Sequence, residues 1–169
     1  KLGSEKFGLI MIAQSLAVFL GIIVDFGLNI SATREVSILK KNKKKLSEYY
    51  WNVIFLKFLL LIFTFGILLI LINLVTKFKI NPDVYLLSFG LVIGQSIFPS
   101  WFFQGIEKMR IITIINVISK LFFTVSIFFF IQSPEDYILS PILNSLGFIF
   151  SGVIGFLFSV KYVNFQKPN

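Results

Sequence analysis

Long apolar runs alternate with short polar segments along this chain of 169 residues. A helix that crosses a bilayer needs about 20 mainly apolar residues, because each residue rises about 1.5 Å against a hydrocarbon core of about 30 Å. The segments that meet this requirement are 7–30, 51–75, 84–103, 111–131 and 138–160. The pattern predicts an all-α fold, a polytopic transmembrane bundle of five spanning helices, with no soluble domain.

Composition agrees with this prediction and removes several kinds of chemistry. Apolar residues make up 56% of the chain, above the usual range of about 45–50% for soluble domains. The sequence contains no cysteine and no histidine, so thiol nucleophiles, histidine bases and the usual zinc or copper ligand sets are absent. We therefore expect a protein that is not an enzyme and that uses no cofactor or metal.

Charge is distributed unevenly between the two predicted faces of the membrane. The formal net charge is +8, and a basic cluster can indicate nucleic-acid binding. Here the basic residues flank apolar spans, ten on the face of segment 31–50 and four on the other, as expected of a topology signal. We predict a cytoplasmic segment 31–50, an outside amino end, a cytoplasmic carboxyl end and no nucleic-acid partner. The run 40–45 then sets orientation, with binding to anionic lipids as the alternative.

The chain begins at Lys1, and no charged segment, short apolar core and cleavage site follow it. We interpret residues 1–169 as a single membrane-domain fragment of a longer protein. An outside amino end suggests that at least one helix precedes it.

One polar stripe lies inside a predicted span. Thr113, Asn116, Lys120 and Thr124 are separated by three, four and four residues, which aligns them on one helical face. A charge near the centre of a bilayer is costly, so such a stripe is expected to line a cavity or face the bundle interior. The alternative is a structural lysine whose ammonium group binds backbone carbonyls.

Two further charges lie at matching depth on consecutive predicted spans. Asp25 lies near the end of the first span and Lys57 near the start of the second. Each alone would be an uncompensated charge in a low-dielectric setting, so we expect an ion pair. Alternatively, Lys57 extends its side chain to the headgroups.

Small residues recur every fourth position in two spans, which allows close approach of helices in lipid. They are Gly90 and Gly94 in one span, and Gly147, Ser151, Gly155 and Ser159 in another. Pro99 is expected to kink or end its helix near residues 96–98.

Several blocks resemble, in order, bacterial polysaccharide flippases of the Wzx, or O-antigen transporter, type. The blocks are LGSEKFGL at 2–9, DFGLN at 25–29, SATRE at 31–35, WFFQGIEKM at 101–109, NVISK at 116–120 and NSLG at 144–147. This family belongs to the multidrug, oligosaccharidyl-lipid and polysaccharide exporter superfamily, whose members have two lobes of helices around a central cavity. The resemblance implies that the chain is part of one lobe and lacks the first helix and the second lobe.

The resemblance also implies a function, which is flipping of an undecaprenyl-diphosphate-linked oligosaccharide across the bacterial inner membrane by alternating access. Its partners would be that lipid-linked substrate, membrane lipids and the remaining parts of its own chain. The Thr113–Thr124 stripe would contact the headgroup, and Arg34 at the cytoplasmic mouth could bind diphosphate in a forked geometry. Arg34 could instead pair with Glu35 or Asp25.

Two other functions remain open from the sequence. A cation-coupled small-molecule exporter of the same superfamily would be expected to use membrane carboxylates, and Asp25 is the only one within these spans. A non-transporting scaffold subunit would not need a lysine at mid-membrane depth.

Overall fold

The computed structural model describes residues 3–164, apart from the side chain of Pro134. Its elements, in chain order, are α1 (Ser4–Asp25), α2 (Leu28–Leu39), α3 (Lys43–Leu74), α4 (Thr76–Ile80), α5 (Pro82–Ile97), α6 (Ser100–Gly105), α7 (Met109–Phe130), η1 (Pro134–Ile138) and α8 (Leu139–Val160). Helical segments long and apolar enough to cross a membrane cover Ser4–Leu39, Lys43–Leu74, Pro82–Gly105, Met109–Phe130 and Glu135–Val160. The predicted bundle of five spanning helices is confirmed.

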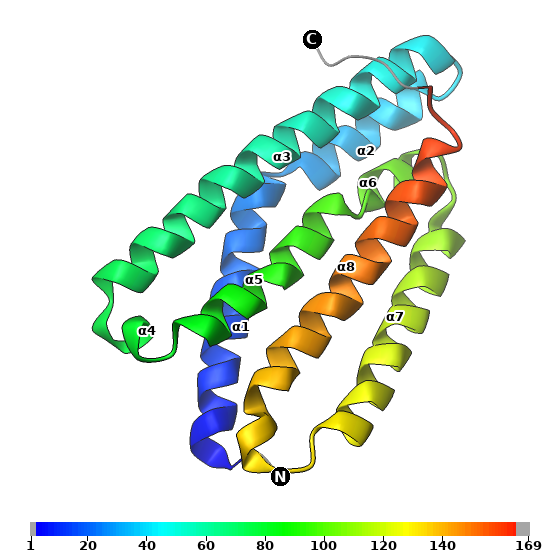
Figure 1. Cartoon of the computed structure of the whole chain (residues 1–169). Helices are drawn as coiled ribbons and strands as arrows, with labels where there is room; N and C mark the ends of the chain where they lie inside the picture. The colour runs from blue at the N-terminus through cyan, green and yellow to red at the C-terminus, as the bar shows by residue number, and fades with distance from the viewer. Residues whose placement is uncertain (1–2, 165–169) are drawn as a thin grey trace.

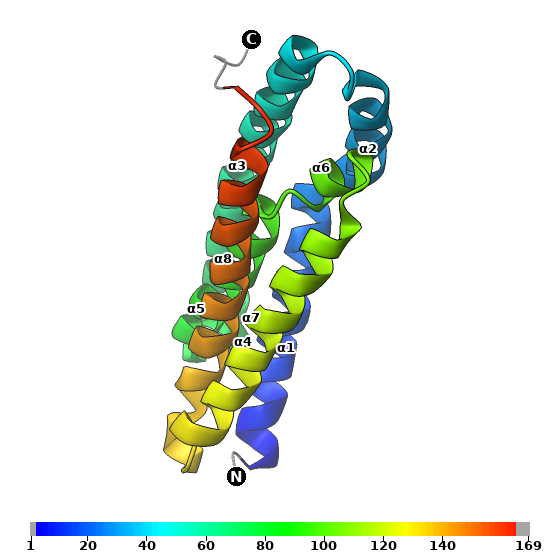
Figure 2. The same ribbon diagram turned by 90° about the vertical axis from the view of Figure 1, so that its right-hand side faces the viewer.

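The long helices form two layers (Figures 1 and 2). Helices α3, α5 and α8 lie in one layer, with α5 packed between the other two, and α1 and α7 lie on one face of that layer. Helix α1 packs mainly on α5, and α7 packs mainly on α8. Because α1 and α7 make almost no contact with each other, the space between them is left open along the bundle.

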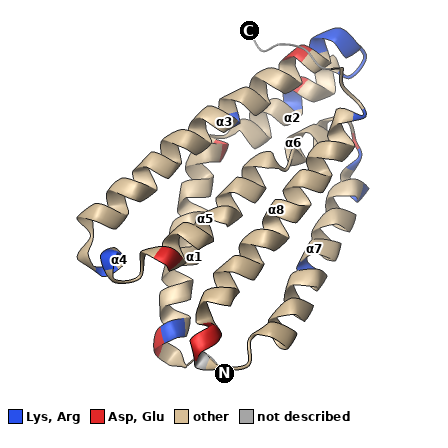
Figure 3. Ribbon diagram, viewed as in Figure 1, with Lys and Arg blue, Asp and Glu red and all other residues tan. Residues whose placement is uncertain are grey.

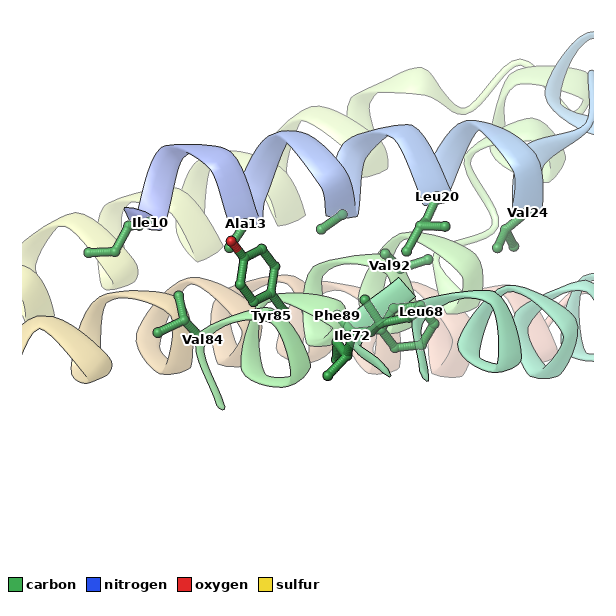
Figure 4. Packing of buried hydrophobic residues seen from close by; sticks show 11 residues of the cluster. Ile10, Ala13, Leu20, Val24, Leu68, Ile72, Val84, Tyr85, Phe89 and Val92 are labelled. Carbon is green, nitrogen blue, oxygen red and sulfur yellow. The ribbon is translucent and has the colours of Figure 1, made fainter. Parts of the chain in front are cut away.

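One apolar core joins α1 to the centre of the first layer. Figure 4 shows that its side chains extend from α1 toward α5 and α3: Ile10, Ala13, Leu20 and Val24 from α1, Tyr85, Phe89 and Val92 from α5, and Leu68 and Ile72 from α3. Lipid is as apolar as these side chains, so their contribution comes from close van der Waals packing rather than from removal of water. This core fixes one wall of the open space.

A second core lies at the other end of α3. It is formed mainly by α2, the first turns of α3, and α6, and its largest buried members are Tyr50, Trp101, Phe102 and Phe103. The Tyr50 ring contacts the rings of Trp101 and Phe102 at centroid distances of 5.5 and 5.0 Å. The Tyr50 hydroxyl is hydrogen-bonded to Ser159 Oγ at 2.6 Å. This second core therefore ties α2, α3, α6 and the end of α8 together.

The first predicted span, 7–30, is wrong at its carboxyl end. Helix α1 ends at Asp25, and Phe26 and Gly27 both adopt positive φ values, 42° and 74°, before α2 begins. The sequence also suggested a polar connection over 31–50, but most of it is helical. Ala32 and Val36 of α2 are buried against α6, because α2 is amphipathic and its apolar face covers the second core.

The third span is interrupted at the same level of the bundle. Helix α5 ends at Ile97, and Pro99 precedes α6, as the missing amide of proline predicts. Hydrogen bonds join the two helices that follow these breaks, because Thr33 Oγ1 of α2 lies 3.2 Å from the carbonyl oxygen of Trp101 in α6, and Ser100 Oγ of α6 lies 3.3 Å from Asn29 Oδ1 in α2. Helix α3 continues unbroken past this level, and so does α8, whose Gly155 lies against Phe98.

Glycines set the distance between α5 and α8. A Cβ on Gly152 would lie 2.5 Å from the backbone oxygen of Gly94, and one on Gly90 would lie 2.5 Å from Ser145 Cβ. Side-chain atoms cannot be accommodated at such distances, so the two backbones touch only because hydrogen replaces Cβ. This contact between α5 and α8 forms the floor of the open space between α1 and α7.

Candidate functional site: a groove between α1 and α7

The open space contains a series of connected cavities, which we call the α1–α7 groove. An apolar cavity of about 750 Å³ lies beside the start of α1 and the end of α7. A middle cavity of about 270 Å³ shares Phe123 and Asn144 with it. An inner cavity of about 470 Å³ shares Asn116, Lys120 and further residues with the middle one. The groove therefore runs along the bundle from one end toward the helix breaks.

The two ends of the groove differ in chemistry. The apolar cavity is lined largely by side chains such as Phe7, Met11, Phe123, Ile127 and Phe128. The inner cavity carries several polar groups instead: Asn29, Gln95, Ser100, Asn116, Lys120 and Ser151. Polar side chains at membrane depth normally face protein or a water-filled space. The inner part of the groove is thus suited to a polar group and the other end to hydrocarbon.

The structure brings three members of the sequence stripe to the groove. Lys120, the twelfth residue of the 22-residue helix α7, lines both the middle and inner cavities together with Asn116. Thr124 lines the middle cavity. Thr113 is exposed and lines neither; its hydroxyl donates to the Met109 carbonyl at 3.5 Å.

Lys120 has no partner among the residues that the structure describes. Its side chain is exposed to the groove, and no hydrogen bond or ion pair to it is present in residues 3–164. Neither cavity that Lys120 lines includes an Asp or Glu side chain. A structural lysine held by backbone carbonyls, the alternative from sequence, is not what these contacts show. Its ammonium group is available to an anion or a hydroxyl group.

The two charges expected to pair do lie together. Lys57 Nζ of α3 is 3.3 Å from Asp25 Oδ1 at the end of α1. The Lys57 side chain is 4% exposed and that of Asp25 31%, so Lys57 does not extend to the headgroups. The pair closes a small pocket of about 50 Å³ behind the groove, which we call the hub pocket.

Asn29 connects the ion pair to the groove. Lys57 Nζ lies 3.5 Å from Asn29 Oδ1, and Ser100 Oγ donates to the same oxygen at 3.3 Å. Asn29 therefore lines both the hub pocket and the inner cavity. Lys57 of α3 contacts the end of α1 and the first turn of α2, and so bridges the break between them.

Arg34 is not brought into the groove. It is exposed on α2 and belongs to the lining of neither the middle nor the inner cavity. The part of α2 that reaches the groove is its first turn, which carries Asn29. The sequence placed Arg34 near the mouth because a direct polar connection was expected there, whereas a helix occupies that segment.

Several lining residues were not singled out by sequence reasoning. Gln95 precedes and Ser100 follows the break between α5 and α6, whose position decides which way they face, and Asn29 stands in the first turn after the other break. Ser119 lines the middle cavity, and its buried hydroxyl has no partner among the described residues. Its position one residue before Lys120 gives no periodic signal. Knowledge of the breaks would have been needed to find these residues.

The two ends of the bundle also differ in charge (Figure 3). The end with the α2–α3 turn, which we call the basic end, carries nine described basic residues: Arg34, Lys40, Lys41, Lys43, Lys44, Lys45, Lys108, Arg110 and Lys161. The opposite end has Lys6, Lys77 and Lys79, together with four carboxylates. At the basic end, Lys40 Nζ contacts Glu107 Oε1 at 2.8 Å. This contact lowers the pKa of the Glu107 carboxyl. The inner cavity is the one nearer to the basic end.

Comparison with known proteins identifies the family. All 169 residues match the family described as "Polysaccharide biosynthesis protein". The chain belongs to this family. A polytopic bundle with a polar groove is in keeping with that membership.

Curated relatives support the assignment. The chain is 28% identical over 153 residues to a "Putative O-antigen transporter" of Escherichia coli (strain K12), covering 90% of this chain and 37% of the relative. It is 27% identical over 153 residues to a protein of the same description from Shigella dysenteriae, covering 90% and 38%. The chain thus spans well under half the length of these two relatives. No solved structure matches it significantly.

Proposed function

We propose that the full-length protein moves a lipid-linked oligosaccharide across the bacterial inner membrane, and that the inner part of the α1–α7 groove contacts its polar headgroup. The observation that carries the proposal is the position of Lys120. This cation, unpaired within residues 3–164, lies in the middle of a spanning helix and faces a groove lined by amides and hydroxyls, in a chain whose relatives are described as O-antigen transporters.

The chemistry of the groove suits a headgroup with sugars and phosphate. Amide and hydroxyl side chains both donate and accept hydrogen bonds, as sugar hydroxyls require. The aromatic side chains of Phe98 and Phe148 line the same cavity and offer apolar faces. Lys120 adds a positive charge for an anionic group. Translocation requires no chemical change of the substrate, so the proposed role needs no catalytic residue.

We also propose that the basic end faces the cytoplasm. Lysine and arginine accumulate on the cytoplasmic side of membrane proteins, and nine of the described basic residues gather at that end. Cysteine substituted at Asn81 should then react with an impermeant reagent added outside the cell, and cysteine at Asn42 should not. The reverse labelling pattern would invert the proposed orientation.

Transport in the complete protein would follow alternating access. In many transporters, one helical bundle rocks against another around a site near mid-membrane depth. In this proposal the chain is one such bundle, and the α1–α7 groove is its part of the site. The remainder of the full-length protein would supply the opposing wall.

Replacement of Lys120 tests the function. The expected result of Lys120→Ala in the full-length protein is loss of surface polysaccharide at normal protein level, because the groove loses its cation. Thr113→Val is the matched control on the same helix, since Thr113 lies outside both cavities. Surface polysaccharide is measured by quantitative blotting of intact cells. Normal assembly in Lys120→Ala would remove Lys120 from the site.

A further inference from the structure

Asn29 is placed to act as a second anion contact in the groove. It lies in the first turn of α2, where the helix dipole is positive. It lines both the hub pocket, which contains Asp25 and Lys57, and the inner cavity, which contains Lys120. No other described residue but Gln95 is shared by these two spaces.

The neighbours of Asn29 determine which way its amide points. A protonated lysine only donates hydrogen bonds, so the Asn29 atom facing Lys57 at 3.5 Å is the carbonyl oxygen. Ser100 Oγ approaches that same oxygen at 3.3 Å. The amide nitrogen is therefore directed away from both, and it has no hydrogen-bond partner within residues 3–164.

Lys57 also changes the strength of this amide as a donor. A positive charge next to the carbonyl oxygen polarises the amide, and hydrogen bonds in a chain strengthen one another in a low-dielectric setting. Lys57 is 3% exposed, so solvent screens it little. Asp25 holds the ammonium group from the other side. Because the Asp25 carboxylate offsets much of this charge, the main effect of Lys57 is to hold the Asn29 carbonyl oxygen and leave the amide N–H as the donor toward the cavity.

We infer that Asn29 binds an oxyanion of the substrate headgroup together with Lys120, which approaches from the α7 wall, and that Lys57 and Asp25 act as positioning residues. This inference rests on the proposed function. The residues lining the inner cavity include no carboxylate that would repel an anion. The ligand chemistry is a phosphate ester or a sugar carboxylate. Asn29 thereby takes the role for which the sequence suggested Arg34.

The decisive variant is Asn29→Asp in the full-length protein. Aspartate has the same shape and retains an oxygen for Lys57 and Ser100, but it lacks the amide donor and adds a negative charge. Binding of pyrophosphate is measured by calorimetry in phosphatidylcholine nanodiscs, with glucuronate as a second ligand. We expect Asn29→Asp to weaken binding about tenfold or more, as loss of a charge-assisted contact implies, while the unfolding temperature is unchanged or raised.

Two further variants separate positioning from folding. The double variant Asp25→Asn/Lys57→Met removes the charges as a pair, so a folded protein is expected with weaker pyrophosphate binding, since the Asn29 carbonyl oxygen loses the donor that orients its amide. A purely structural pair would leave binding unchanged in the folded double variant. The control is Gln14→Leu, a polar residue that lines only the apolar cavity, and it should bind pyrophosphate like the wild type.

The outcomes distinguish this inference from the proposed function. Weakened binding of pyrophosphate alone indicates a phosphate ligand, and weakened binding of both ligands indicates a general oxyanion site; either supports the inference. Wild-type affinity in Asn29→Asp overturns it. If Lys120→Ala loses binding while Asn29→Asp retains it, the proposed function stands and the role of Asn29 fails. Absence of binding to the wild-type protein contradicts the inference as well.

Discussion

Helices α5 and α7 are both apolar spans, yet they have opposite roles in the bundle. Of the 18 consecutive residues that are most apolar in the segment containing α5 and α6, 67% are buried within the bundle, against 17% of those in α7. Helix α5 packs closely on its neighbours through Gly90 and Gly94. Helix α7 has a polar stripe that faces the groove and apolar residues, such as Ile118 and Phe122, on exposed surfaces. Helices of similar hydropathy can therefore form a packing wall, as α5 does, or a lining wall, as α7 does. The few residues that are not large and apolar distinguish the two: glycines in the packing wall and polar side chains in the lining wall.

The largest expected effect comes from filling the contact between α5 and α8. A Cβ on Gly94 would collide with the backbone of Phe148, and backbone cannot rotate away as a side chain can. We expect Gly94→Ala to destabilise the protein by about 3 kcal/mol, the upper end of the usual cost of overpacking. Gly66→Ala is the matched control, because a Cβ there meets nothing within 4 Å. Thermal unfolding in detergent compares the two, and equal unfolding temperatures would refute the close-packed wall.

The next effect comes from the ion pair that supports the lining wall. Asp25→Asn leaves Lys57 buried without a full counter-charge, and we expect a loss of about 2 kcal/mol. This is below the usual 3–5 kcal/mol for breaking a buried pair, because Asp25 is partly exposed and asparagine retains an acceptor oxygen. Adding Lys57→Met should restore stability. Additive losses in the double variant would show that the two residues act independently.

Two serines provide a smaller comparison between the walls. Ser88 of α5 is buried and donates to the Val84 carbonyl at 2.7 Å, whereas the buried Ser119 hydroxyl of α7 has no partner among the described residues. We expect Ser88→Ala to destabilise by about 1 kcal/mol and Ser119→Ala to be neutral or stabilising. Unfolding temperatures measured without substrate test this. A larger loss in Ser119→Ala than in Ser88→Ala would show that the Ser119 hydroxyl is satisfied in the protein.

The smallest effect is expected at the exposed ion pair of the basic end. Lys40 and Glu107 are both solvated, so water and salt screen their attraction. Glu107→Gln should leave the unfolding temperature unchanged at any salt concentration, in contrast to Asp25→Asn. A clear loss of stability that disappears in high salt would show that this contact is structurally important.

Much of the fold could be predicted from sequence because the bilayer constrains length and polarity. The five spans, the packing role of the glycines, the break at Pro99 and the proximity of Asp25 to Lys57 all follow from spacing and helix geometry. The interruption at Phe26 and Gly27 could not be predicted in this way, because the apolar pattern continues through it to Ile30. The helix α2 was missed for a related reason, since its many polar residues suggested an exposed connection.

The candidate site was predictable only where it depends on a regular helix. Asn116, Lys120 and Thr124 share a face of α7 and line one cavity, and their spacing predicted a stripe that lines a cavity or faces the bundle interior. Asn29 and Ser100 reach the groove because two broken spans meet at one level. Their roles depend on tertiary contacts that no local pattern records. Arg34 shows the converse, since a suitable residue type on α2 faces away from the cavities.

A photocrosslinking experiment tests most directly whether α7 lines a substrate path. A photoreactive amino acid is placed in the full-length protein at Asn116, which faces the groove, or at Ile118, which is exposed on another face of the same helix. After irradiation of cells, adducts are analysed by mass spectrometry for lipid-linked oligosaccharide. The account predicts glycolipid adducts at position 116 and only bulk phospholipid at position 118. Glycolipid adducts at position 118 but not at 116 would contradict it.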